Sequence, residues 1–264
     1  MNEQQGFVCS VCGHYNDHFD SSPHRELMAC SSCGSNMRFR AIACAVTRAA
    51  LGRVGVLKEL PTNRDFRAIG ISDSAAYAQV LERKFDYTNT YLHTEPFLDI
   101  EDMASFSRYG PLDLIVCSDV IEHTLRPPAA VLRNLAMALK PGGHLVLSAP
   151  TYAMPDTVER YPTLQDFEVV ATADGQWQVK YRTRYGTVGI DPAPVFHGGP
   201  GRVLELRVIS HSQLMSEVLA AGLEPLPALD AALQIHGAAW PPMVERSDVP
   251  FPMDGGVLLA RRPR

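Results

Sequence analysis

Residues 111–150 read PLDLIVCSDVIEHTLRPPAAVLRNLAMALKPGGHLVLSAP, and this stretch decides the fold. Its first apolar run, residues 112–117, is short enough for a strand that is buried on both faces. Apolar residues at helical spacing follow over residues 129–139, and residues 140–143 supply the cation, proline and glycines that stop a helix. A second apolar run, residues 144–149, predicts another strand. The stretch therefore predicts a strand–helix–strand unit of a parallel sheet.

Polar residues follow the first of these strands directly, from Ser118 to His123. In an open parallel sheet, ligands bind outside the carboxyl ends of the strands. We therefore expect the chemistry of this chain near Asp119. A parallel-sheet core without any cofactor would also fit the apolar residues, but it leaves the polar segment DVIEH unexplained.

This stretch also resembles a known family. The phrase DLIVCSDVIEHTLRP…VLRNLAMALKPGGHLVLSAP is similar to the region around the fourth and fifth strands of the Rossmann-like (class I) S-adenosylmethionine (SAM)-dependent methyltransferases. The resemblance implies an α/β fold with a doubly wound, mostly parallel sheet and an antiparallel last strand. It also implies that Ser118, Asp119 and Val120 line the adenosyl pocket, with His123 near the methyl end. His123 would either accept a proton or orient the site by a hydrogen bond.

The first strand and helix of such a unit fall within residues 65–85. Gly70 would let the backbone approach SAM, and Ser72 or Asp73 would cap the helix over residues 74–84. We expect all three residues to contact the cofactor. Family members usually carry a second glycine where this chain has Ser72, so the loop departs from the pattern. A full GxGxxG motif is absent, which argues against NAD or FAD.

Acidic residues after the second strand are the next candidates. The family resemblance implies one acid for the ribose hydroxyls and another near the adenine. Glu95 is the candidate for the ribose, and Asp99 with Ile100 is the candidate for the adenine side. Either carboxylate could instead lie on the surface of a loop.

Two Cys-x-x-Cys pairs stand near the N-terminus, Cys9 with Cys12 and Cys30 with Cys33. Their spacing predicts a closed, structural zinc site with four thiolate ligands. Such a small unit depends on its metal for folding energy. The alternatives are two disulfides, no metal, or replacement of a cysteine by His14, His18 or His24.

The phrase CGSNMRFR resembles a zinc-ribbon segment that precedes a methyltransferase domain in one bacterial family. Arg38 and Arg40 would then pack over the active site or contact an anionic substrate, unless they are surface charges at the start of a helix. We predict a zinc-ribbon domain over residues 1–40 and a methyltransferase domain over residues 41–264. A helix over residues 41–60 would join them.

Residues 151–205 interrupt the Rossmann pattern and are too long for a simple connection. They predict a β-hairpin that turns at residues 173–175, followed by a glycine-rich loop. We expect this insertion to form the substrate pocket, with His197 as the proton acceptor and His123 as its competitor. A surface hairpin that only covers the sheet is the alternative. The proposed substrate contacts are Tyr152, Tyr185, His197 and Arg202.

Composition limits the remaining possibilities. The chain of 264 residues is 46% hydrophobic and 20% charged, as in ordinary globular proteins. A net charge of −5 disfavours nucleic acid as the main partner. No apolar run approaches the ~20 residues of a membrane span, and no signal peptide is recognisable, so we expect a cytoplasmic protein. The oligomeric state is left open.

The expected reaction is methyl transfer from SAM to an oxygen or nitrogen, less readily a carbon, of a small molecule, as in natural-product or secondary metabolism. Two other functions remain open. The substrate could be a protein or RNA docked by the zinc ribbon, or the chain could be a binding module that has lost catalysis. A helix over residues 210–222 and two antiparallel strands near residues 223–229 and 256–260 would complete the domain.

Overall fold

A six-stranded sheet forms the centre of the protein, in the order β15-β16-β6-β5-β3-β4. The structure is a computed structural model that describes residues 6–17, 24–199, 201–240, 244, 247–253 and 256–264. The four strands at one side are parallel, whereas β16 is antiparallel to β6 and β15 is antiparallel to β16. This confirms the predicted fold class. The strands are β3 (Asn63–Ile71), β4 (Phe85–Thr90), β5 (Leu112–Ser118), β6 (Leu139–Ser148), β15 (Glu224–Pro225) and β16 (Val257–Arg261).

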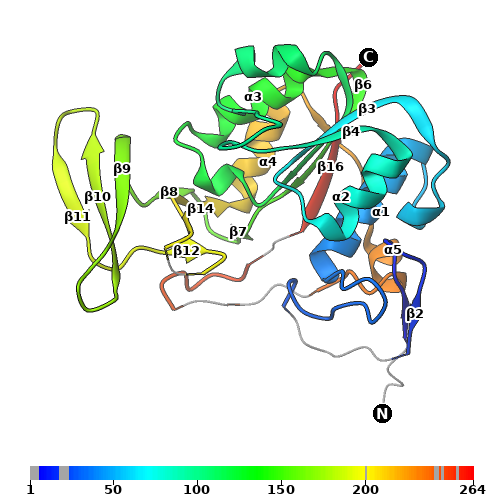
Figure 1. Ribbon diagram of the computed structural model, residues 1–264, viewed down its shortest axis with the longest axis horizontal. Coiled ribbons are helices and arrows are strands. Elements are labelled where there is room, and N and C mark those ends of the chain that lie inside the picture. The colour runs from blue at the N-terminus through cyan, green and yellow to red at the C-terminus, as the bar shows by residue number, and fades with distance from the viewer. Residues whose placement is uncertain (1–5, 18–23, 200, 241–243, 245–246, 254–255) are drawn as a thin grey trace.

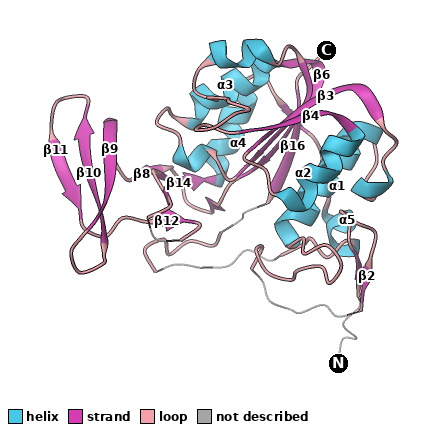
Figure 2. Cartoon of the chain, in the orientation of Figure 1, coloured by secondary structure: helices cyan, strands magenta, loops and turns pink. Residues whose placement is uncertain are grey.

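Helices cover both faces of this sheet (Figures 1 and 2). On one face lie α1 (Met37–Leu51) and α2 (Ala75–Lys84), and on the other lie α3 (Pro128–Ala138) and α4 (His211–Ala220). Strand β5 serves both cores, because Leu114 and Val116 pack with the first pair of helices and Ile115 and Cys117 with the second. Its continuous apolar run is therefore explained by burial on both faces.

The helix boundaries differ from prediction in two places. Helix α1 begins at Met37, where Asn36 accepts a hydrogen bond from the Phe39 amide, and it ends at Leu51 before a left-handed Gly52. The prediction of residues 41–60 was therefore wrong at both ends. Helix α2 is capped by Ser74, not by Ser72 or Asp73. Ser72 has φ of 56°, outside the extended range that an N-cap residue adopts.

The predicted helix stop at residues 140–143 lies instead within β6, which begins at Leu139. The C-terminal segment explains the difference. The amide of Gly142 donates to the Arg262 carbonyl at 2.9 Å, and the amide of Arg262 donates to the Gly143 carbonyl at 2.8 Å. These contacts pair Gly142 and Gly143 with the C-terminal segment shortly after α3 ends at Ala138, and Gly142 has a left-handed φ of 83°.

The N-terminal unit is small, and one arginine joins it to the C-terminal part of the chain. Its strands β1 (Phe7–Val8) and β2 (Tyr15–Asn16) pair antiparallel. The fully buried Arg40 donates to the carbonyls of Met28 and Ser35 in this unit, and to those of His236 and Gly237 near the C-terminus. Arg40 is therefore neither a surface charge nor a substrate contact.

The insertion forms a separate three-stranded sheet of β9 (Leu164–Ala171), β10 (Trp177–Thr183) and β11 (Val188–Asp191), which projects at the left of Figure 1. The predicted hairpin is confirmed, with Trp177 opposite Ala171, and β11 adds a third strand. Short strands connect it to the centre: β7 (Thr151–Tyr152), β8 (Val158–Glu159), β12 (Phe196–His197), β13 (Val203–Leu204) and β14 (Arg207–Ser210). The remaining elements are η1 (Leu57–Glu59), η2 (Met103–Arg108), η3 (Ile121–His123) and α5 (Asp230–Ile235). Among the described helices, none is both long and apolar enough to cross a membrane.

Candidate functional site

The four N-terminal cysteines converge. Their ligand atoms all lie within 4.8 Å of one another, and the Cys9–Cys33 and Cys12–Cys30 sulfur pairs are each 3.7 Å apart. A tetrahedral ion with Zn–S bonds of about 2.3 Å separates its sulfurs by about 3.8 Å. All four thiols are free, so the alternative of two disulfides is not observed. The cluster fits a structural zinc ion.

Both cysteine pairs form the same turn. The amide of Gly13 donates to the Cys9 carbonyl and that of Gly34 to the Cys30 carbonyl, each at 2.8 Å. Both glycines have positive φ, of 83° and 71°, which explains why glycine follows each pair. Among the histidines named as alternative ligands, His14 and His24 are not part of the cluster, and His18 lies outside the described residues.

The N-terminal unit reaches the carboxyl end of β5 through two arginines. Arg25 makes a two-pronged contact with the Asp119 carboxylate, with nitrogen–oxygen distances of 2.6 and 3.2 Å. Arg38 donates to the Ser118 hydroxyl at 2.5 Å, and its Nε lies 3.3 Å from Asp119 Oδ2. Glu26 accepts from Arg38 on the other side. Arg38 therefore lies over the predicted site and is not a surface charge at the start of a helix.

This network is largely excluded from water. The side chains of Arg25, Arg38 and Asp119 are 7%, 13% and 18% exposed. Burial alone would raise the pKa of Asp119, but Arg25 and Arg38 lower it below its ordinary value. Conversely, burial opposes the charge of Arg38, whereas Asp119 and Glu26 raise its pKa. Asp119 is therefore a charged carboxylate already engaged by two guanidinium groups.

The predicted cofactor loop is built around Asp73. Its carboxylate accepts hydrogen bonds from the hydroxyls of Tyr77 and Tyr87, at 2.8 and 2.7 Å. Asn89 at the end of β4 accepts from the Asp73 amide and donates to its carbonyl. A Cβ on Gly70 would collide with the Tyr87 hydroxyl and the Asp73 carboxylate. Glycine at position 70 is thus required by these side chains.

Asp73 also gives the stability of the protein a defined pH dependence. Burial raises its pKa from 3.8 to about 7, although the hydroxyls of Tyr87 and Tyr77 act in the opposite direction. The folded protein therefore binds a proton at Asp73 more tightly than the unfolded chain does. The contribution of Asp73 to the free energy of unfolding is thus most favourable below pH 3.8 and is lost as pH rises to about 7.

We expect Asp73→Asn to remove this loss of stability between pH 3.8 and about 7, because an amide releases no proton in that pH range. Urea unfolding at a series of pH values measures the effect. The free energy of unfolding of the wild type should fall relative to that of the variant as pH rises from 3.8 to about 7. A constant difference between the two proteins would contradict the assignment.

The acids after β4 are placed differently from each other. Glu95 lies on an exposed loop, with its side chain 73% exposed and 3.2 Å from Arg108. Asp99 is half-buried and accepts a hydrogen bond from the Glu101 amide at 2.8 Å, while Ile100 belongs to the core. The structure therefore places Glu95 on the surface and leaves Asp99 partly buried.

The two candidate histidines lie together. His123 Nε2 and His197 Nδ1 are 3.1 Å apart, although 74 residues separate them in the chain. The other nitrogen of each ring is held by an acceptor: His123 Nδ1 lies 2.7 Å from the Leu204 carbonyl, and His197 Nε2 lies 2.8 Å from Glu205. Arg160 in turn contacts Glu205 at 2.6 Å.

Glu122 is the third member of this cluster. Its Oε1 lies 3.4 Å from His197 Nδ1 and 3.6 Å from His123 Nε2, and the side chain is fully buried. Burial alone would lower the pKa of His197, but the carboxylates of Glu122 and Glu205 raise it to about 9. An imidazole in this position is therefore a cation at neutral pH when nothing else is bound, and it is not ready to accept a proton.

The other predicted substrate contacts do not join His197. Tyr152 is 2% exposed and packs in a core with Val208, Val249 and Met253. Tyr185 is 85% exposed in the turn between β10 and β11, and Arg202 is exposed in the turn between β12 and β13. Tyr152 therefore lies in a core, and Tyr185 and Arg202 lie in exposed turns. Contact of these three residues with a substrate stays a prediction.

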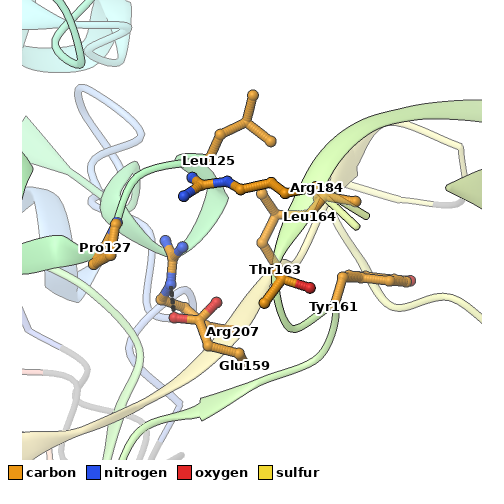
Figure 3. Close-up of a pocket in the computed structure, with 9 residues that line it drawn as sticks. Leu125, Pro127, Glu159, Tyr161, Thr163, Leu164, Arg184 and Arg207 are labelled. Carbon is orange, nitrogen blue, oxygen red and sulfur yellow. Dashed lines mark hydrogen bonds and ion pairs between the residues drawn. The ribbon is translucent and has the colours of Figure 1, made fainter. Parts of the chain in front are cut away.

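A cavity of about 230 Å³ lies instead between the insertion and the loop before α3. In Figure 3 the guanidinium groups of Arg184 and Arg207 point into the same space, and a dashed line joins Arg207 to Glu159. Arg207 is 2% exposed and also donates to the Ile121 carbonyl at 2.7 Å. The lining residues are Leu125, Pro127, Glu159, Tyr161, Thr163, Leu164, Arg184, Leu206 and Arg207.

Sequence reasoning missed several members of these networks. Arg25 and Glu205 carried no motif, and the partner of Arg25, Asp119, lies 94 positions away in the chain. A signal did exist for Asn89, because polar residues at the carboxyl end of a parallel strand point to a site. The unrecognised members are Arg25, Glu26, Tyr77, Tyr87, Asn89, Arg160 and Glu205.

Comparison with solved structures finds several methyltransferases of low sequence identity. One is an S-adenosylmethionine-dependent methyltransferase from Mesorhizobium loti, with 16% identity, a TM-score of 0.42, and coverage of 86% of this chain and 99% of that one. Another is CalS10 from Micromonospora echinaspora, an amino pentose methyltransferase of calicheamicin biosynthesis, with 15% identity, a TM-score of 0.41, and coverage of 87% and 92%.

A third is the 1,6-didemethyltoxoflavin-N1-methyltransferase of Burkholderia thailandensis, with 14% identity, a TM-score of 0.40, and coverage of 85% and 79%. No curated protein sequence matches the chain. The family model described as "Methyltransferase domain" matches residues 19–195, which is more than half of the sequence. The chain therefore belongs to the methyltransferase-domain family.

Proposed function

We propose that this protein transfers a methyl group from SAM to an oxygen or nitrogen of a small molecule. The observation that carries the proposal is the family match over residues 19–195, on a chain whose sheet brings the ends of β3 and β5 side by side. SAM supplies an activated methyl on a sulfonium. The protein must mainly position the acceptor, so proximity and orientation would account for much of the rate.

The residues at these strand ends support a cofactor site in part. Ser72 is exposed after β3, and Asp99 and Val120 are half-buried. We propose that SAM lies across Gly70, Ser72, Asp99, Asp119 and Val120. In that arrangement Asp119 acts through the arginines that hold it, because both of its oxygens already accept hydrogen bonds.

The N-terminal unit supports a small acceptor over a macromolecule. Its arginines Arg25 and Arg38 point inward to Asp119, and Arg40 is fully buried. These cations are thus not available to dock RNA or an acidic protein. We propose that the ribbon holds one zinc ion at Cys9, Cys12, Cys30 and Cys33, and that its role is to close and order the site.

Calorimetry with SAM and S-adenosylhomocysteine tests the proposal. We expect binding by the wild type and weaker binding by Asp99→Ala, by about 1–3 kcal/mol, because a buried polar group of the ligand loses its acceptor. Glu95→Ala should have a smaller effect, since that side chain is 73% exposed. Equal affinities for wild type and Asp99→Ala would remove Asp99 from the site.

A second candidate function is a non-catalytic binding module. The specific observation in its favour is that Asp73, Tyr87, Arg25 and Arg38 already fill the ends of β3 and β5 with mutual contacts. Absence of binding at high micromolar concentrations of both SAM and S-adenosylhomocysteine would support this function and contradict methyl transfer.

A further inference from the structure

The cluster of Glu122, His123 and His197 contains three acceptors that face one another. Because His123 Nδ1 lies against the Leu204 carbonyl, its proton belongs on that side and the Nε2 lone pair points into the cluster. His197 Nε2 likewise lies against Glu205, which directs the Nδ1 lone pair inward. The Glu122 carboxylate is the third acceptor.

The buried Glu122 carboxylate needs a positive charge beside it, either a protonated His197 or a metal ion. Both of its oxygens are buried without a hydrogen-bond partner, and its side chain is fully buried. Within the part of the chain that the structure describes, only the two histidines lie within ion-pair distance of it. An unpaired buried carboxylate is costly, so a positive charge is expected at the centre of the cluster.

We propose that Glu122, His123 and His197 bind a divalent transition-metal ion, separate from the ion of the four cysteines. The distances among the three ligand atoms are 3.1, 3.4 and 3.6 Å. A tetrahedral ion with bonds of about 2.0–2.1 Å to nitrogen and oxygen separates its ligands by about 3.3–3.4 Å. The three atoms thus already form one face of such a coordination shell.

The surroundings match those of metal-bound histidines. A ligating imidazole usually donates its second N–H to a carbonyl or a carboxylate, and here Leu204 and Glu205 fill these roles. Two imidazoles and one carboxylate favour zinc or a neighbouring transition metal, whereas magnesium and calcium prefer oxygen ligands alone.

The site would keep one position open. The side chain of His197 is 29% exposed, whereas that of Glu122 is fully buried, so solvent reaches the cluster beside His197. A substrate oxygen or nitrogen could fill the open position and would be polarised there. This last role rests on the proposed function, but binding of the ion does not.

Metal counting by native mass spectrometry on the full chain tests the proposal, with zinc as the probe. We expect two zinc ions per wild-type chain, and one in His197→Ala and in Glu122→Gln. The exposed His93 provides a matched control, and His93→Ala should keep two. In both site variants the affinity for the second ion should fall by more than about 100-fold, since even loss of an outer-shell partner costs about 10–100-fold.

Replacing zinc by cobalt shows which of the two ions a variant has lost. The thiolate charge-transfer bands of the cysteine site should persist in His197→Ala, while the weaker bands of the second cobalt disappear. His197→Ala alters a partly exposed side chain, so it decides the outcome even if Glu122→Gln does not fold. A single ion in the wild type would overturn the proposal and assign the central charge to a proton. Two ions retained in His197→Ala would overturn it as well, because the second ion would then not depend on His197.

Discussion

Cys30→Ser should release the zinc ion of the N-terminal cysteines and unfold the unit that they hold. A serine hydroxyl replaces one of four thiolates in a cluster whose sulfur–sulfur distances fit a tetrahedral ion. Structural zinc sites of this kind contribute about 10–16 kcal/mol of apparent binding energy, and that energy is folding energy. The expected readouts are a loss of one zinc per chain and rapid proteolysis before residue 37.

Cys44→Ala is the matched control, because Cys44 is buried in α1 but does not belong to the cluster. It should keep its zinc and its protease resistance, with the modest loss of stability of a small buried side chain. If Cys30→Ser keeps both properties as well, the cysteines do not hold a structural metal.

The second large effect concerns Asp119. Asp119→Ala should destabilise the protein by about 3–5 kcal/mol, because removal of one partner leaves the other charges buried and uncompensated. Arg25 and Arg38 would then face a cavity, with Glu26 as the remaining nearby carboxylate. Urea unfolding measures the loss, and hydrogen exchange of residues 24–36 should show that the N-terminal unit opens first.

Asp113→Ala provides the comparison, since Asp113 pairs with Lys140 across a more exposed surface. Its effect should be about 1 kcal/mol or less. A double-mutant cycle between Asp119 and Arg25 isolates the pair, and we expect a coupling energy above about 1 kcal/mol. Similar losses for Asp119→Ala and Asp113→Ala would show that the contact with the N-terminal unit is not maintained in solution.

The parts of the fold set by local patterns could be predicted from the sequence. The strand at residues 112–118 is marked by an apolar run. The helix expected over residues 210–222 is α4, which Ser210 caps. The cysteine spacing likewise specifies a four-sulfur cluster. The end of α1 was misplaced because Leu57 continues the apolar period in a separate 3-10 turn.

The networks of the site depend on distant pairs, and single-sequence patterns carry no information about these. Arg25 meets Asp119 across 94 positions, and His123 meets His197 across 74. His123 could be identified as a candidate from its polar segment and His197 from its glycine-rich segment. The contact between the two histidines could not be predicted. Glu122 was noticed only as the neighbour of His123. The sequence of this Glu-His pair does not show which of the two side chains is buried.

The contacts of Arg40 set an order in which parts of the chain can pack together during synthesis on the ribosome. This guanidinium docks on the carbonyls of His236 and Gly237, which are synthesised 196 and 197 residues later. At about 5–20 residues per second, that delay lasts on the order of 10–40 s. During this interval the nascent N-terminal unit has its cysteines but not its final neighbours. The four cysteines are therefore available to the proposed metal before the Arg40 contacts with the C-terminal segment can form.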